Sequence, residues 1–162
     1  MTPVGIFYGS TDGATARIAQ LMKEKLEQLL AGEREPDVEL FDIAQSGLAP
    51  FARFEWLILG VPTWNTGQLQ RDWERVLPEL AGIDLPGKRV AIFGLGDQVG
   101  YPATFVDAMF FVADYVRTAG AALLGAWPID GYEFVNSWAV EDGQFLGLVL
   151  DEHSQADLTA AG

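Results

Sequence analysis

Three short stretches of the sequence carry residue types that could hold a charged, planar ligand. The first, residues 9–15, is small and rich in hydroxyl groups, and it opens directly into an amphipathic segment. Glycines allow a tight turn, hydroxyls offer hydrogen bonds, and the N–H groups at a helix start carry partial positive charge, so this stretch could bind a phosphate. A plain helix cap is the alternative. The candidate ligands are Ser10, Thr11, Asp12, Gly13, Ala14 and Thr15.

The other two stretches each carry an aromatic ring. Trp64 lies within residues 61–67, and Tyr101 ends a glycine-rich turn that starts at residue 94. Two rings on neighbouring loops could hold a planar ligand between them, each with stacking worth about 1 kcal/mol beyond the buried area. Each ring alone could simply cover a strand end. The candidate residues of these loops are Pro62, Thr63, Trp64, Asn65, Thr66, Gly67, Gly94, Leu95, Gly96, Asp97 and Tyr101.

Short apolar segments must position these loops. Residues 4–8, 56–60 and 90–93 hardly alternate between apolar and polar types, which is typical of parallel strands buried on both faces. Further strands are expected at 38–41 and 122–125, and helices at 15–30, within 69–80 and at 104–118. This alternation predicts an α/β fold: a three-layer, doubly wound, five-stranded parallel sheet in one domain, residues 1–162. Ligands bind beyond the carboxyl ends of such strands, where all three loops fall.

The last strand is expected to be interrupted. Residues 122–125 begin it, residues 127–143 mix aromatic and acidic types without a helical period, and the apolar residues 145–150 resume it. We therefore expect an irregular inserted loop over residues 126–147.

The amino-acid composition excludes several kinds of functional site and ligand. The 162 residues include no Cys and one His, His153, which excludes disulfides, cysteine-based metal centres, a thiol nucleophile and a His-rich metal site. A formal charge of −13 argues against nucleic-acid binding and allows a basic protein partner. The start of the sequence lacks the pattern of a secretory signal, and no apolar run approaches the roughly 18 residues that span a bilayer. We expect a cytoplasmic protein that binds no nucleic acid and no membrane.

A phosphate loop combined with two rings describes a site for flavin mononucleotide (FMN). Three further features accompany these loops: residues 72–74, the Gly-Asp-Gln run before Gly100 and Tyr101, and the insertion motif at 130–134. With them, practically the whole chain resembles the flavodoxin family, specifically the long-chain flavodoxins. The resemblance implies a low-potential carrier that binds FMN and shuttles single electrons between a basic flavodoxin reductase and a basic electron acceptor. It implies an electron carrier rather than an enzyme.

The resemblance also implies a role for each loop. Residues 10–15 would hold the FMN phosphate, and Trp64 and Tyr101 would flank the isoalloxazine ring. The peptide within residues 65–67 would turn over to bond the reduced flavin at N5, and the backbone of residues 95–97 would contact its pyrimidine edge. Because the three loops carry no Lys or Arg and the net charge is −13, we expect the second electron to be added with difficulty.

The sequence departs from the family pattern in three places. Asp12 stands where Thr or Ser is usual and Ala14 where Lys is frequent, which should weaken phosphate binding unless Asp12 caps the helix or faces solvent. His153 and Ser154 stand near the ribityl side, where an acid and Asn are common. The chain stops where the family continues into a helix over one sheet face, so we expect that helix to be missing and the protein to be a monomer, or a dimer if the exposed face pairs.

The sequence leaves three alternative functions to consider. An FMN-dependent NAD(P)H or quinone reductase would need an open cavity over the flavin, which two covering rings disfavour. A signalling receiver domain would need paired acids after the first strand, an Asp at the end of the third and a Lys after the fifth, and the sequence does not supply them. A protein that has lost its flavin is the last alternative.

Overall fold

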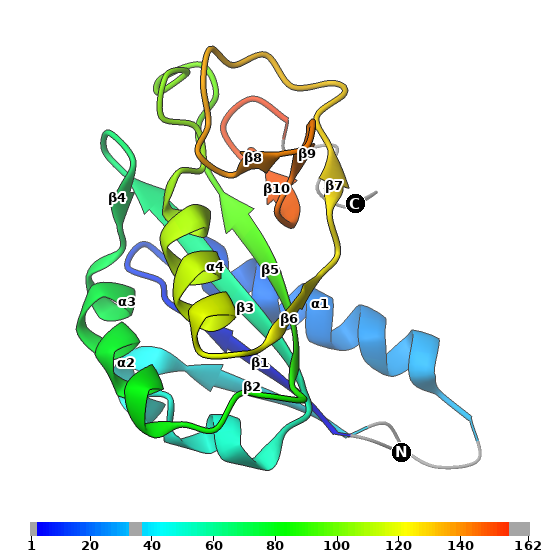
Figure 1. The fold of residues 1–162 in the computed structure, drawn as a ribbon. Coiled ribbons are helices and arrows are strands. Elements are labelled where there is room, and N and C mark those ends of the chain that lie inside the picture. Colours follow the sequence, from blue (N-terminus) through cyan, green and yellow to red (C-terminus); the bar gives the residue numbers. More distant parts are fainter. Residues whose placement is uncertain (1–2, 33–36, 156–162) are drawn as a thin grey trace.

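A parallel sheet forms the centre of the molecule (Figure 1). The computed structural model describes residues 3–32 and 37–155. Its main sheet has the order β10-β5-β3-β1-β2, and β6 also pairs with β5. The strands are β1 (Val4–Tyr8), β2 (Val38–Asp42), β3 (Trp56–Trp64), β5 (Arg89–Leu95), β6 (Ala122–Leu124) and β10 (Leu148–Leu150). The doubly wound α/β fold predicted from the sequence is confirmed, as is the split fifth strand.

Helices cover both faces of this sheet, which gives three layers (Figure 1). On one face, Ile18 and Ala19 of α1 pack against Ile6 and Phe93. On the other face, the larger part of the core lies under α4 and the short helices, with Trp73 and Met109 fully buried. The helices are α1 (Ala14–Leu30), α2 (Ile43–Ser46), α3 (Arg71–Val76) and α4 (Ala108–Thr118), with 3₁₀ helices η1 (Ala49–Arg53) and η2 (Leu77–Gly82).

Several element boundaries differ from the expectation. The helix expected within 69–80 is α3 followed by η2, because Pro78 enters the first turn of η2. The helix expected from 104 begins only at Ala108, because Val106 adopts a positive φ of 49° that no α-helix contains. Strand β3 continues to Trp64 and pairs with the two-residue β4 (Gln68–Leu69), so Trp64 ends a strand instead of lying at a loop tip.

The insertion is more ordered than expected. Instead of an irregular loop, it contains a small antiparallel sheet of order β7-β9-β8: β7 (Trp127–Pro128), β8 (Val140–Glu141) and β9 (Gln144–Phe145). Phe145 therefore belongs to this sheet, and the fifth parallel strand resumes at Leu148 instead of 145. Two-residue strands are too short to produce an alternation that could be read from the sequence.

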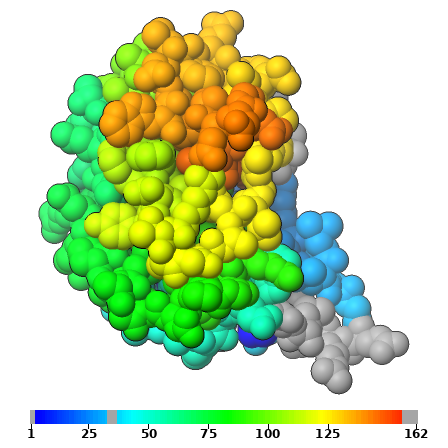
Figure 2. All heavy atoms as spheres, viewed as in Figure 1, coloured from blue at the N-terminus to red at the C-terminus, as the bar shows by residue number. Residues whose placement is uncertain are grey.

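Aromatic packing joins the insertion to the rest of the protein. Phe105 lies just before α4, and its ring contacts those of Tyr132, Phe134 and Phe145 with centroids 5.5–6.1 Å apart. The Tyr132 hydroxyl donates to the Val149 carbonyl of β10 at 2.5 Å. In the space-filling view, the orange atoms of the insertion lie directly on the yellow-green atoms of α4 (Figure 2). The insertion is thus packed onto the core and is not a loose appendage.

An apolar groove of about 440 Å³ lies on the face of the sheet beside α1. Leu26 and Leu30 of α1, Trp56 and Ile58 of β3, and Leu124 of β6 are among its lining residues. The expectation that a C-terminal helix is missing concerns the end of the chain, and residues 156–162 lie outside the described residues. None of the helices in the described ranges is long and apolar enough to cross a membrane.

Candidate functional site

A cleft of about 210 Å³ lies beyond the carboxyl ends of β1, β3 and β5. Twelve of the seventeen residues predicted from the sequence line it, so the structure brings the three loops together. These twelve are Thr11, Asp12, Ala14, Thr15, Pro62, Thr63, Trp64, Asn65, Leu95, Gly96, Asp97 and Tyr101. Five further lining residues were not among the predicted set: Thr104, Phe105, Val106, Glu152 and His153.

The other five predicted residues do not line the cleft but lie in or next to the same three loops. Ser10 Oγ accepts a hydrogen bond from Gly13 N at 3.1 Å, and Gly13 has a φ of +92° that favours glycine. Thr66 is exposed and Gly67 is buried, both in the turn between β3 and β4. Gly94 is buried in β5, where a Cβ would overlap Met109 Sδ.

The first loop presents the start of a long helix to the cleft. The opening N–H groups of α1 have no partner within the helix, which makes this end suited to an anion. Asp12 Oδ1 accepts from Ala14 N at 3.0 Å, so the carboxylate caps one of these groups, as one sequence alternative allowed. Arg17, one turn further, pairs with Glu152 on the cleft wall. A cation is therefore present near this loop, already engaged with an acid.

Gln70, which the sequence analysis missed, anchors that loop to α3. Its buried side chain donates from Nε2 to Thr11 Oγ1 at 3.2 Å, and its Oε1 accepts from Trp73 N at 3.2 Å. Trp73 in turn donates from its indole to the Gly60 carbonyl of β3 at 2.8 Å. Gly9 fits against these side chains because a Cβ there would lie 2.8 Å from Trp73 Cδ1. A lone Gln ahead of a short helix gave no sequence signal.

The third loop is held by the side chain of Asp97. Its Oδ1 accepts from Val99 N at 3.1 Å and Gly100 N at 2.9 Å, and its carbonyl accepts from Tyr101 N at 3.0 Å. These bonds fix the turn that carries Tyr101, whose side chain is 41% exposed. Trp64, on the neighbouring strand, is partly buried. The cleft therefore has one ring shielded by protein and one at the solvent edge.

A buried carboxylate, Asp151, connects the cleft to the insertion. Its two oxygens accept from Gln98 N at 3.0 Å, His153 N at 3.0 Å, and Ser154 N and Oγ at 3.1 and 2.6 Å. The Gln98 side chain extends the network by accepting from Glu133 N at 2.5 Å. Burial raises the pKa of Asp151, but the hydrogen bonds from Ser154 and Gln98 outweigh burial and hold the pKa below its ordinary value.

Residues 104–106 supply the wall that the sequence placed inside a helix. Val106 is fully buried with a φ of +49°, which is unusual for a β-branched residue. Its Cγ1 would lie 2.8 Å from a Cβ on Gly96, so glycine at that position allows the two walls to meet. No local sequence signal indicates a valine in this conformation.

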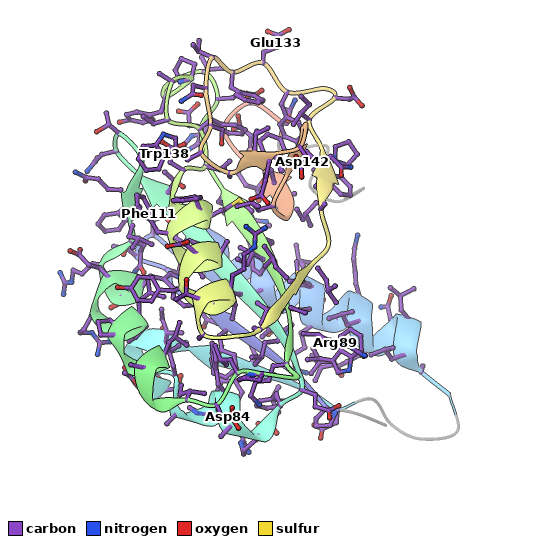
Figure 3. The ribbon with its side chains drawn as sticks, viewed as in Figure 1. Asp84, Arg89, Phe111, Glu133, Trp138 and Asp142 are labelled. Carbon is purple, nitrogen blue, oxygen red and sulfur yellow. The ribbon has the colours of Figure 1, made fainter. Side chains whose placement is uncertain are left out.

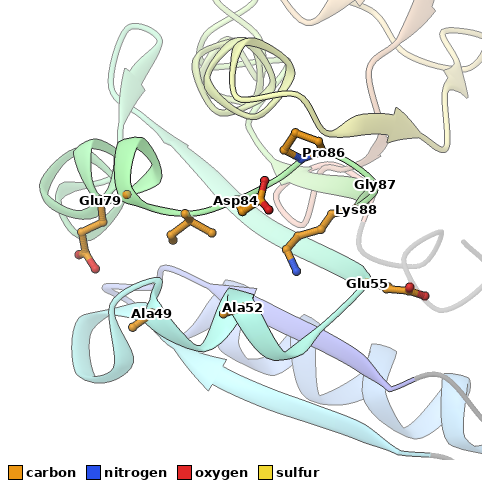
Figure 4. Close-up of a pocket in the computed structure, with 10 residues that line it drawn as sticks. Ala49, Ala52, Glu55, Glu79, Asp84, Pro86, Gly87 and Lys88 are labelled. Atoms are coloured by element: carbon orange, nitrogen blue, oxygen red, sulfur yellow. The ribbon is translucent and has the colours of Figure 1, made fainter.

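A larger groove of about 610 Å³ lies at the opposite, amino end of the strands (Figure 4). Two of its charged residues already bond to the backbone of the fold: Lys88 Nζ donates to the Phe54 carbonyl at 2.6 Å, and Glu79 Oε1 accepts from Leu48 N at 3.2 Å. Volume alone would favour this groove. The chemistry favours the smaller cleft, because only there do a helix start, hydroxyl groups and two aromatic rings converge.

Comparisons with known proteins agree on one family. A family model described as flavodoxin matches residues 6–161. The chain is 43% identical over 159 residues to a flavodoxin of Synechococcus elongatus, covering 98% of this chain and 90% of the relative. It is 39% identical over 161 residues to flavodoxin 1 of Escherichia coli, covering 99% and 88%. A crystal structure of Fusobacterium nucleatum flavodoxin bound to flavin mononucleotide superposes with a TM-score of 0.91 at 31% identity, covering 99% and 92%.

Proposed function

Because this chain belongs to the flavodoxin family, we propose that its cleft binds one FMN and that the protein carries single electrons between redox partners. The observation that carries the proposal is the convergence of the α1 start, Trp64 and Tyr101 on one cleft. A relative with a closely similar fold binds FMN. The protein is an electron carrier rather than an enzyme, and we propose that all 162 residues act as one FMN-binding domain.

The residues of the cleft fit a phosphate-bearing planar group. The Thr11 and Thr15 hydroxyls and the free N–H groups of α1 would hold the phosphate, with Ser10 and Gly13 shaping the loop. Trp64 and Tyr101 would lie on the two faces of the ring system, while the backbone of residues 62–67 and 94–97 would contact its edge. When bound, FMN supplies the redox chemistry, and the protein supplies binding, orientation and electrostatics.

Asp12 makes the phosphate end of this site unusual. Its carboxylate hydrogen-bonds to Ala14 N at the start of α1, where a phosphate would also bind. Because Asp12 both caps the helix start and is exposed, the two conditions under which the sequence predicts no weakening are met, and we propose that Asp12 does not lower the affinity of the site for FMN.

The reductase alternative is not favoured. An FMN-dependent NAD(P)H or quinone reductase needs room for a second substrate against the flavin ring. Trp64 and Tyr101 both line a cleft of about 210 Å³, and a ring system held between them has both faces covered. Electrons would therefore enter and leave at the exposed edge, beside Tyr101.

Titrating the flavin-free protein with FMN tests the proposed function. We expect saturation at one flavin per chain with strong quenching of flavin fluorescence, because Trp64 stacks on the ring. The variant Trp64→Ala should bind FMN about tenfold more weakly and quench less, since stacking and burial of one ring are lost. Trp56→Ala is the matched control, because Trp56 is 37% exposed at the amino end of β3 and does not line the cleft. A folded wild-type protein that shows no saturation would contradict the proposal.

As an electron carrier the protein has redox partners, and we propose that they are a basic flavodoxin reductase and a basic acceptor. Asp12, Asp97 and Glu152 line the cleft, and the net charge of −13 supports steering of cationic surfaces toward it. The association rate with a basic flavodoxin reductase should fall steeply as ionic strength rises from 0.01 to 0.15 M, values that shorten the Debye length from about 30 to 8 Å. A rate independent of salt would contradict electrostatic steering.

We propose that the carrier acts as a monomer in the cytoplasm, and cell fractionation would test that location. Pairing through the apolar groove of Leu30, Trp56 and Leu124 is the alternative. A sedimentation mass near the chain's 17.7 kDa would support the monomer, and twice that mass would support pairing.

A further inference from the structure

Asp107 is a buried carboxyl group that the proposed function does not use. Its side chain is 6% exposed at the start of α4, and its Oδ1 accepts a hydrogen bond from Trp138 N of the insertion at 2.8 Å. Its Oδ2 would lie 2.9 Å from a Cβ on Gly67, so this oxygen faces the turn after β3. Asp107 therefore lies between that turn and the insertion.

This position is directly behind two walls of the cleft. Val106, the preceding residue, lines one wall, and Asn65, two residues before Gly67, lines the next. The Thr63 hydroxyl, on the same wall as Asn65, accepts from Ala108 N at 3.1 Å and ties β3 to the start of α4. The carboxyl group is thus held directly behind residues that line the cleft.

The segments packed around Asp107 provide no charge to neutralise it. Residues 60–70, 102–113 and 134–140 contain Asp107 as their single ionisable residue. No ion pair in the described part of the chain includes it. Burial raises the pKa of its carboxyl, and the hydrogen bond from Trp138 N opposes that rise. The ionisable residues nearest in sequence to these segments are Glu55, Arg71, Asp72, Asp97, Tyr101, Asp114, Glu133 and Glu141.

Trp138 makes this arrangement rigid. Its ring meets that of Phe110 edge-on at 5.6 Å and that of Phe111 at 5.8 Å, so both sides of the hydrogen bond to Asp107 are anchored on α4. Figure 3 shows Trp138 and Phe111 side by side at the upper end of that helix. The carboxyl group cannot turn toward solvent without losing the hydrogen bond from Trp138 N.

We propose that Asp107 sets the potential at which the bound flavin takes up its second electron, by placing a buried negative charge behind the cleft. The inference rests on the proposed function. One electron from an external reductant, added without a proton to the neutral half-reduced flavin, leaves one extra negative charge on the ring. The Asp107 carboxylate repels this charge, and protonation of Asp107 removes the repulsion. Asp107 acts through the electrostatic field of its carboxylate and does not need to touch the flavin.

The expected effect is large enough to measure. At an effective dielectric constant of about 20, a unit charge roughly 10 Å away changes the equilibrium for adding another charge by about tenfold. For a one-electron couple, tenfold corresponds to 59 mV.

The test compares Asp107→Asn with Asp114→Asn in the FMN-loaded protein. Both remove one negative charge from α4, but Asp114 is exposed and solvent screens it. Asparagine at 107 keeps an oxygen that can accept from Trp138 N. We expect the second-electron potential of Asp107→Asn at neutral pH to be less negative by about 59 mV, with little change for Asp114→Asn. As the pH falls and Asp107 is protonated, the wild-type potential should approach that of the variant. A shift no larger than the control's would overturn the proposal.

A measurement on the flavin-free protein separates this inference from the function it rests on. The amide nitrogen and proton resonances of Trp138 should follow the protonation of Asp107 in the wild type, with a midpoint above the ordinary Asp value, and should not do so in Asp107→Asn or in Asp107→Ser. A flat wild-type profile would overturn the proposal even where FMN binds. Failure of the wild type to bind FMN would instead contradict the proposed function, and the amide titration would reveal that difference.

Discussion

Replacing Gly147 by alanine is expected to destabilise the protein by about 3 kcal/mol or more. A Cβ on Gly147 would overlap the carbonyl oxygen of Ile92 and lie 2.8 Å from its carbonyl carbon. Ile92 is in the middle of β5, which pairs with β3 on one side and with β10 on the other. Because main-chain atoms of a central strand cannot move aside without breaking these pairings, the clash would displace β10 and with it the residues that follow.

Urea unfolding of the flavin-free protein measures this effect. Gly82→Ala is the matched control, because Gly82 is exposed and a Cβ there would meet nothing within 4 Å. Its free energy of unfolding should change by no more than about 0.5 kcal/mol. Equal midpoints for the two variants would mean that β10 does not approach β5 as the structure has it.

Asp151→Ala is expected to cost about 3 kcal/mol of stability at neutral pH and to loosen the cleft. The variant would leave four donors, from Gln98, His153 and Ser154, without their acceptor at a position that is 1% exposed. Glu152 and His153 of the cleft wall follow directly in the chain, so FMN affinity should fall as well. Asp130→Ala, an exposed aspartate of the insertion, is the control for loss of one negative charge.

The effect of Asp151→Ala should depend on pH with a defined sign. Because the folded-state pKa of Asp151 lies below its ordinary value of about 3.9, its ionisation stabilises the fold above that value. This contribution is lost as the pH falls through the folded-state pKa. The gap in unfolding free energy between wild type and variant should therefore narrow below about pH 4. A gap that stays constant down to pH 2 would show that the charge of Asp151 does not contribute.

A cleft residue could be predicted where a residue type suited to ligand binding stands at or just after the end of a predicted strand. Thr11 and Tyr101 follow buried parallel strands and Trp64 ends one, and the carboxyl ends of neighbouring parallel strands meet at one edge. Spacing along the chain was sufficient because the sheet order places β1, β3 and β5 side by side.

The remaining wall depends on contacts that no local pattern shows. Val106 adopts a conformation that its own side chain disfavours, so local propensity indicated helix and tertiary packing decided otherwise. Gln70 and Asp151 act through hydrogen bonds to residues more than fifty positions away in the chain. Phe145 packs the small sheet of the insertion onto the core, because its ring contacts those of Phe105 and Tyr132.

The split fifth strand also affects how readily another chain can add to the edge of the sheet. A continuous strand at this side of the sheet would expose an unbroken row of backbone N–H and C=O groups to which another chain could add. Here the border consists of two three-residue pieces, β6 and β10, which pair with opposite ends of β5, and the chain between them folds into a separate antiparallel sheet. Short, interrupted borders are poor templates for strand addition, so the divided strand disfavours ordered aggregation through this edge of the sheet.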